Sequence, residues 1–372
     1  MKKTFQVIPQ IVQFETCEEF LSDFAIGEGD LIFCNEITYR TFLEGKSGKA
    51  VVIMRESYGD GEPSDELIEA VYSDIKDISY QRVIAVGGGT VIDAAKLFAL
   101  KQFSPVLDLY DGKIKPEKEK TLLLVPTTCG TGSETTNISI LELKERHTKM
   151  GLAVPELYGD YAILIPELLR DLPMRFFATS SIDALIHAME SYTSPKANEF
   201  TEIFSLKAIE KIIAGYQYIV KNGEESRKEI LGDFMTASTY AGIAFGNAGC
   251  AAVHALSYPL GANYHVPHGE ANYVFLTEVY MIYMKIWPKG RIRELNRFLA
   301  ELLHCEEKEV YQKLEELLSK IIVKKSLHEY GMKKEEIKEF TESVLKSQQR
   351  LLKNNYVPFG EKEISSIYQT LF

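Results

Sequence analysis

The chain has 372 residues, of which 45% are hydrophobic and 26% charged, so it can bury a large core and disorder is not expected. Its formal net charge of −11 argues against a nucleic-acid partner, because affinity for phosphates comes from clustered Lys and Arg. No apolar run suits a signal peptide or a membrane span, and the five cysteines form no CxxC pair. We therefore expect a reduced, cytoplasmic setting.

Short apolar runs alternate with helical patterns in the first half of the chain. SDELIEAVYSDIKD (64–77) predicts a helix between two strands. The runs that predict buried strands are DLIFCN (30–35), AVVIM (50–54), RVIAVGGG (82–89) and TLLLVPTT (121–128). This alternation predicts a parallel α/β domain over residues 1–167.

Long segments with apolar residues three and four positions apart follow as far as the C-terminus. Examples are EIFSLKAIEKIIAGYQYIV (202–220), EILGDFMTASTYAGIAF (229–245) and EEIKEFTESVLKSQQRLL (335–352). They predict an all-helical domain over residues 168–372, and two such domains leave a cleft that suits a ligand.

Two predicted strands of the first half run into loops rich in glycine and hydroxyl residues. VIAVGGGTVIDAAK (83–96) continues into a helix, whose N-terminus could receive a phosphate, although a tight turn without a ligand explains the glycines equally well. LLLVPTTCGTGSETT (122–136) repeats the arrangement. Two such loops at neighbouring strand ends favour a dinucleotide over a single phosphate.

The second half contains four candidate metal ligands. Asp183 and His187 are four residues apart in a helical pattern, although such a pair alone is more often a surface or capping pair. His254 lies in a helical segment made mostly of small and apolar residues, and His268 stands where a loop meets a helix. One carboxylate and three histidines suit iron(II), zinc, nickel or manganese, and because no cysteine is expected nearby, the set leans toward the harder ions.

In this order the motifs resemble the iron-containing alcohol dehydrogenase family (group III). The matching pattern comprises GGG-[ST]-xx-D-xx-K at 87–96, PTT-x-GTGSE at 126–134, D-xxx-H at 183–187, and two histidines fourteen residues apart at 254 and 268. The resemblance implies an N-terminal dinucleotide-binding α/β domain and a C-terminal helical domain, with the cofactor and a divalent metal meeting in the cleft.

The resemblance also assigns residues. Asp183, His187, His254 and His268 match the family's metal ligands, with iron(II) as the expected ion and zinc as the alternative. The matching cofactor-binding positions are Gly87, Gly88, Gly89, Thr90, Asp93, Thr127, Thr128, Gly130, Thr131, Ser133 and Lys149. Asn35 stands near the position of an aspartate that binds the adenine ribose in many NAD-using relatives. Glu36 beside it would disfavour NADP if its side chain points inward, so we expect NAD, and NADP is the alternative.

Within the family, HALSYPLGANYHVPHGEANY (254–273) looks most like 4-hydroxybutyrate dehydrogenases. We therefore expect an oxidoreductase that converts 4-hydroxybutyrate to succinate semialdehyde while the metal polarises the substrate oxygen. Tyr258 replaces a histidine found in many relatives, and it either contacts the substrate or packs beside Pro259. His265 is either an exposed or supporting residue without a direct role, or a residue that binds the substrate carboxylate. We take these two side chains as the catalytic candidates.

Other activities remain open. Relatives that oxidise butanol, 1,3-propanediol or lactaldehyde share the motifs, and a dehydroquinate-synthase-like lyase shares the architecture, although the GTGSE loop and Asp183 argue against it. A nucleotide or metal sensor on the same scaffold is disfavoured by the four intact ligands. The expected partners are a small hydroxy acid or alcohol and its aldehyde, and the family tendency is toward a homodimer or larger homo-oligomer.

Overall fold

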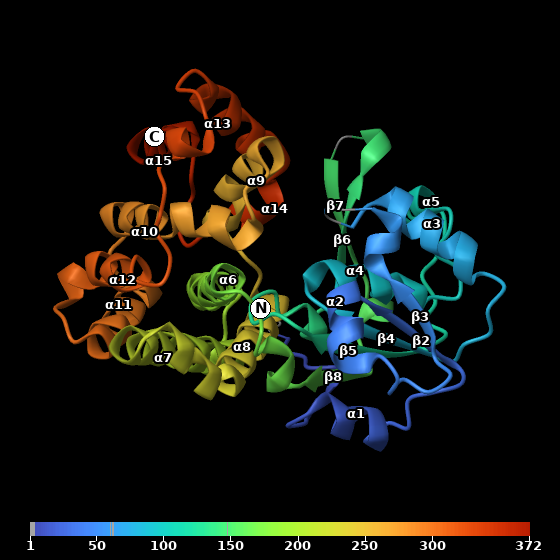
Figure 1. Cartoon of the computed structure of the whole chain (residues 1–372). Helices are drawn as coiled ribbons and strands as arrows, with labels where there is room; N and C mark the ends of the chain where they lie inside the picture. Colours follow the sequence, from blue (N-terminus) through green and yellow to red (C-terminus); the bar gives the residue numbers. More distant parts are fainter. Residues whose placement is uncertain (1–3, 60, 62, 147) are drawn as a thin grey trace. The chain divides into compact units, whose positions relative to one another are not determined.

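The computed structural model describes residues 4–59, 61, 63–146 and 148–372. The chain divides into two compact units, Val7–Leu172 and Pro173–Phe372, and the segment that ends at Gln6 belongs with the second (Figure 1). The boundary predicted after residue 167 falls inside the short 3-10 helix Pro166–Leu169, which lies in the first unit.

A six-stranded parallel sheet with the order β1-β8-β5-β4-β2-β3 forms the centre of the first unit. Its strands are β1 (Gln10–Gln13), β2 (Asp30–Cys34), β3 (Val51–Met54), β4 (Arg82–Gly87), β5 (Thr121–Pro126) and β8 (Tyr161–Leu164). Its helices are α1 (Cys17–Asp23), α2 (Glu36–Thr38), α3 (Asp65–Ile75), α4 (Gly89–Phe98) and α5 (Val106–Tyr110). The predicted parallel sheet is confirmed, and β1, β8 and a separate antiparallel hairpin, β6 (Ile138–Leu143) with β7 (Thr148–Ala153), add to it.

Alternating side chains of the central strands enter two separate cores. On β2, Leu31 and Phe33 pack with α3, α4 and α5, whereas Ile32 and Cys34 pack on the opposite face with α1. Because both faces are covered, the strands consist of nearly continuous apolar runs, which is why the sequence reveals them.

The register of β4 and β5 brings the two glycine-rich loops together. The strands pair from Arg82 opposite Thr121 to Gly87 opposite Pro126, and the Thr127 N–H donates to Gly87 O at 3.0 Å. Both loops therefore begin at the carboxyl ends of neighbouring strands, as the sequence predicts for a shared ligand.

In the second unit, every element that the structure describes is a helix. They are α6 (Met174–Thr193), α7 (Glu199–Asn222), α8 (Leu231–Ala248), α9 (Ala252–Tyr264), α10 (His268–Ile286), α11 (Arg291–Leu303), α12 (Val310–Leu318), α13 (Glu336–Ser347), α14 (Gln349–Leu352) and α15 (Glu361–Leu371). The helical second domain is confirmed, and the pattern at 335–352 is two helices because Gln348 leaves the helical conformation. In the described residues, no helix is long and apolar enough to cross a membrane.

Helix α6 is the central element of this unit, and it packs against α7, α8, α10 and α11 (Figure 1). From Phe177 to its end almost every side chain is buried, including the polar Asp183, His187 and Glu190. Buried ionisable groups are costly unless they are paired or bind an ion, so this helix marks the candidate site.

Candidate metal centre and cofactor-binding loops

The four predicted metal ligands converge inside the helical unit. Asp183 and His187 lie on α6, His254 on α9, and His268 is the first residue of α10. The Asp183 carboxylate is 4.0 Å from His187 Nε2, 3.7 Å from His254 Nε2 and 3.9 Å from His268 Nε2. These distances are long for direct hydrogen bonds and leave space for an ion with ligand bonds of about 2 Å.

Close packing between α10 and α6 brings His268 to this position. A Cβ atom at Gly269 would lie 2.0 Å from Thr179 O of α6, so only glycine allows this approach. The preceding turn depends on His265, which ends α9 with a left-handed φ of 53°. Pro267 then stands immediately before the first residue of α10.

Glu190, which the sequence analysis missed, fixes the ring of His254. Its carboxylate accepts hydrogen bonds from the N–H groups of Ala251 at 2.8 Å and Val253 at 2.6 Å, and lies 2.7 Å from His254 Nδ1. A carboxylate on Nδ1 leaves Nε2 as the metal-binding nitrogen. Because Glu190 follows Asp183 by seven residues, helical periodicity could have placed both on one face.

Asn272 is a second missed residue, one turn after His268 on α10. Its Nδ2 donates to Asp183 Oδ1 at 2.7 Å and lies 3.2 Å from His268 Nε2. Its Oδ1 accepts the hydroxyl of Ser257 from α9. Asn272 therefore fixes the orientation of the Asp183 carboxylate.

The electrostatics of the cluster favour a cation. Burial alone would raise the pKa of Asp183, but the neighbouring His187, His268 and His254 lower it. Burial alone would lower the pKa of His254, but Cys250 and Glu190 raise it well above its usual value. Buried His254 Nε2 has no hydrogen-bond partner in the described part of the chain. This polar nitrogen beside a carboxylate fits a divalent ion.

The expectation that no cysteine lies near these ligands is wrong. Buried Cys250 offers its sulfur beside His187 and His254, and the three ligand atoms lie within 4.8 Å of one another. Asp183, His254 and His268 form a second group with the same spacing. Cys250 precedes His254 by four residues but lies before α9 begins, so helical spacing did not reveal the contact.

The two catalytic candidates differ in their surroundings. Tyr258 is on the continuous helix α9, and its ring stacks on that of His268 with centroids 6.0 Å apart. His265 is exposed and ends the same helix. The geometry places Tyr258 beside a ligand and gives His265 a turn-forming role, and the catalytic role of either side chain stays a prediction.

In the α/β unit, the two glycine-rich loops pack against each other. A Cβ atom at Gly88 would lie 3.3 Å from Thr128 Cγ2, and one at Gly89 would lie 2.9 Å from Thr131 Cγ2. A Cβ atom at Gly87 would meet Val91 at 2.5 Å. Packing thus already accounts for the glycines at positions 87 and 89. Still, no side chain caps the N-terminus of α4, which leaves its backbone N–H groups able to receive a phosphate.

The remaining predicted loop residues divide into two groups. Thr90, Thr127, Thr128 and Thr131 are partly exposed around Gly88 and Gly89, as a ligand-binding loop requires, whereas Gly130 is buried. Asp93 instead accepts hydrogen bonds from the Ser133 hydroxyl and, at 3.0 Å, from Ile140 N–H. The hydrogen bond between Ser133 and Asp93 gives both residues a structural role. That either residue contacts a cofactor stays a prediction.

Asn35 follows β2 and donates its Nδ2 to Glu56 Oε1 at 2.8 Å. The Glu36 N–H donates to the other Glu56 oxygen at 2.9 Å, while the Glu36 side chain pairs with Arg40 at the surface. Burial opposes ionisation of Glu56, but the hydrogen bonds from Asn35 and Glu36 lower its pKa. Glu56, missed in the sequence, therefore provides the carboxylate beside Asn35. Lys149 is exposed on β7, opposite Glu142.

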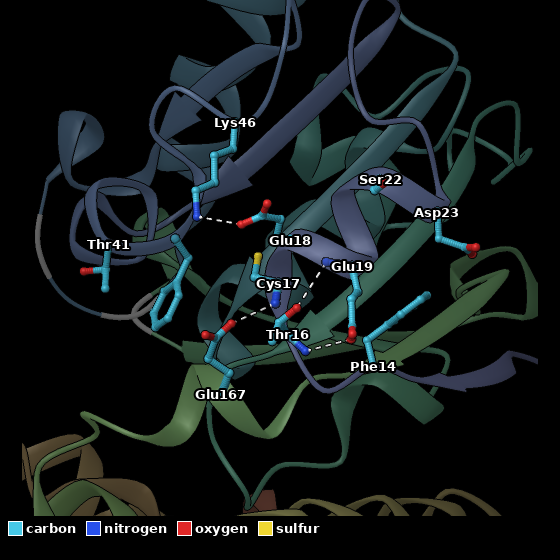
Figure 2. A pocket seen from close by; sticks show the side chains of 11 residues that line it. Phe14, Thr16, Cys17, Glu18, Glu19, Ser22, Asp23, Thr41, Lys46 and Glu167 are labelled. Atoms are coloured by element: carbon cyan, nitrogen blue, oxygen red, sulfur yellow. Dashed lines mark hydrogen bonds and ion pairs between the residues drawn. The ribbon is translucent and has the colours of Figure 1, made fainter.

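None of the predicted cofactor-binding residues lines a hollow of about 790 Å³ in the α/β unit (Figure 2). It is lined by the β1–α1 connection, α1, the segment around Thr41 and Lys46, and Glu167. Figure 2 shows Lys46 paired with Glu18, and the Glu167 carboxylate accepting a hydrogen bond from the Cys17 N–H. Four of the five charged residues in this lining are acidic, so the hollow does not suit cofactor phosphates.

Glycine-rich loops at the ends of parallel strands, together with one aspartate and three histidines in a helical unit, define a metal-dependent, nicotinamide-linked dehydrogenase. The model of iron-containing alcohol dehydrogenases matches residues 30–166, and the C-terminal model of the Fe-containing alcohol dehydrogenase family matches residues 177–372. The chain therefore belongs to the iron-containing alcohol dehydrogenase family and is an oxidoreductase that acts on CH–OH groups.

Individual relatives agree with this assignment. The chain is 53% identical over 370 residues, covering 100% of both chains, to 4-hydroxybutyrate dehydrogenase of Clostridium kluyveri. It is 34% identical to long-chain-alcohol dehydrogenase 1 of Geobacillus thermodenitrificans, over 84% of this chain and 80% of that protein. The structure of sulfoacetaldehyde reductase from Bifidobacterium kashiwanohense with NAD+ shares the fold, with a TM-score of 0.87, 19% identity, and coverage of 100% and 99%.

Proposed function

We propose that this protein is an NAD-dependent 4-hydroxybutyrate dehydrogenase, which interconverts 4-hydroxybutyrate and succinate semialdehyde. The observation that carries the proposal is the 53% identity to the Clostridium kluyveri enzyme along the whole of both chains. The convergence of Asp183, His187, His254 and His268 supports it, because one carboxylate and three imidazoles brought together can hold the metal that such a dehydrogenase needs.

The donor set fits a divalent ion, and iron(II) is the proposed one. Asp183, His187, His254 and His268 would hold it, and when bound it supplies Lewis-acid polarisation of the substrate oxygen while the nicotinamide exchanges hydride. Glu190 orients His254, and Asn272 orients Asp183. The His268 side chain is 41% exposed while those of the other three are buried, so the substrate would approach from the His268 side.

Tyr258 is the proposed hydrogen-bond donor to the substrate. Its ring stacks on His268, on the more exposed side of the cluster. Burial raises the pKa of Tyr258 above its usual value, so the group stays a phenol at neutral pH and donates a hydrogen bond rather than accepting a proton.

The carboxylate at the far end of the substrate needs a cation, and Arg350 is our candidate. It is exposed on α14, which packs against α9. Burial raises the pKa of Tyr258, and the positive charge of Arg350 is close enough to oppose that rise. A guanidinium binds a carboxylate well, because its planar N–H groups can donate two parallel hydrogen bonds.

The proposed preference for NAD rests on Glu56. Its ionised carboxylate, held by Asn35 and the Glu36 backbone, would accept hydrogen bonds from ribose hydroxyls and repel a 2′-phosphate.

In the same proposal, the protein assembles as a homodimer or larger homo-oligomer. Phe200 and Ile203, 60% and 66% exposed on α7, are apolar surface that such an assembly could cover.

The proposal is tested with anaerobically purified protein loaded with iron(II). We expect succinate semialdehyde to be reduced with NADH at a kcat/KM at least about tenfold above that for butanal or with NADPH, a difference of ~1.4 kcal/mol. Arg350→Met should raise KM for succinate semialdehyde and leave butanal unaffected, with Lys353→Met as the matched control. Equal rates of the wild type on succinate semialdehyde and butanal would refute the hydroxy-acid assignment.

A further inference from the structure

Cys250 lies inside the cluster of metal ligands, although nothing in the family motif assigns it a role. Its backbone position is fixed from both sides. Gly249 has a φ of +79°, and a Cβ there would lie 2.5 Å from Asn354 Nδ2, which itself donates to Ala248 O at 2.6 Å and Cys250 O at 3.2 Å. The thiol is therefore held at the cluster by the fold and is 8% exposed.

Two sets of donors share His254. One set is Asp183 and His268 with His254, which offers a carboxylate and two imidazoles. The other is His187 and Cys250 with His254, which offers a sulfur and two imidazoles, all buried. The rings of His187 and His254 stack with centroids 4.7 Å apart, so the two histidines of this set lie side by side.

The unpartnered nitrogen of His254 indicates that an ion belongs here. Glu190 occupies Nδ1, and the buried Nε2 has no hydrogen-bond partner in the described residues. Carboxylate oxygens suit harder ions, whereas a thiolate selects softer ones such as zinc or cadmium. His254 belongs to both sets, so it can serve ions of either kind.

We propose that Cys250 is an additional metal ligand, and that thiophilic divalent ions such as zinc, cobalt and cadmium bind it together with His187 and His254. On binding, the thiol loses its proton to solvent and a sulfur–metal bond forms, with no change in oxidation state. Harder ions such as manganese use Asp183 and His268 and do not bind the sulfur. This inference concerns metal choice and does not depend on the identity of the substrate.

The consequence is a site that binds zinc more tightly than its aspartate and histidines alone would. His187, Cys250 and His254 are all buried, whereas the His268 side chain is 41% exposed, so a metal held by the first three lies away from the side from which the substrate would approach. Zinc bound through Cys250 is therefore expected to reduce turnover relative to iron(II), and replacing Cys250 should weaken this inhibition.

Cobalt(II) provides the test, because a thiolate ligand adds a near-ultraviolet charge-transfer band that oxygen and nitrogen ligands lack. Metal-free wild-type protein is titrated with cobalt(II) without oxygen, beside Cys250→Ser, Cys250→Ala and the control Cys305→Ser. We expect one band per bound cobalt in the wild type and Cys305→Ser, and none in the Cys250 variants.

Competition with a chelator should show zinc affinity about tenfold or more lower in Cys250→Ser, with manganese affinity unchanged. Retained manganese binding also shows that the variant is folded with its site intact. Bound cobalt without the band in wild-type protein, or a band that persists in Cys250→Ser, would overturn the proposal. Because these measurements need no substrate, they are separate from the test of 4-hydroxybutyrate activity.

Discussion

Replacing Glu190 with glutamine tests how far the metal centre depends on one residue that need not touch the ion. The Glu190 carboxylate is fully buried and accepts from Val253 N–H on Oε1, and from Ala251 N–H and His254 Nδ1 on Oε2. A glutamine keeps two of these bonds if its oxygen takes the Oε2 position. Its NH₂ group then faces the Val253 N–H, so two donors oppose each other.

The expected cost follows from these contacts. An unsatisfied buried donor costs about 1–3 kcal/mol, so the metal-free variant should be about 2 kcal/mol less stable. Loss of the negative charge makes His254 a weaker base, and such a change behind a ligand typically lowers metal affinity by about 10–100-fold. His254 should therefore remain a ligand but a poorer one.

Urea unfolding of metal-free protein and a cobalt(II) competition titration measure the two effects separately. Glu210→Gln is the matched control, because Glu210 is on the neighbouring helix α7 and pairs with Lys207 at the surface. Stability and cobalt affinity in Glu190→Gln that both equal those of Glu210→Gln would refute the positioning role.

Three further variants test other parts of the structure. Lys96→Met removes a fully buried ammonium that donates to Ser133, Thr136 and Ile138, and it should lower the stability measured in urea by ~3 kcal/mol without altering metal affinity. Glu56→Gln should cost about 1 kcal/mol at neutral pH. Because hydrogen bonds lower the pKa of folded Glu56, this stabilisation is lost as pH falls through that value, and the gap to wild type should close in acid. Tyr258→Phe should lower kcat/KM about tenfold while leaving metal affinity unchanged, and unaltered kinetics would favour a packing role.

The sequence predicted the fold well where one physical signal dominated. The strands β2, β4 and β5 are buried on both faces, so their apolar runs stand out. β3 lies at the sheet edge and is only half-buried, but all four of its residues are apolar, so it is still recognisable. β1 is harder to recognise because it lies at the sheet edge, where exposed Gln10 and Gln13 flank its apolar residues. The hairpin β6–β7 was missed for a similar reason, since most of β7 is exposed.

The parts of the site that sequence reasoning missed depend on contacts between segments. Glu190 had a usable signal, because residues 183, 187 and 190 follow helical spacing and share one face of α6. Cys250 had none, because it precedes α9 and reaches His187 only through the turn at Gly249 and the hydrogen bonds of Asn354. Four motif residues therefore indicate that a metal binds. Which metals the site accepts depends also on a sulfur that the tertiary structure alone brings to it, so the motif is an incomplete guide to metal preference in this chain.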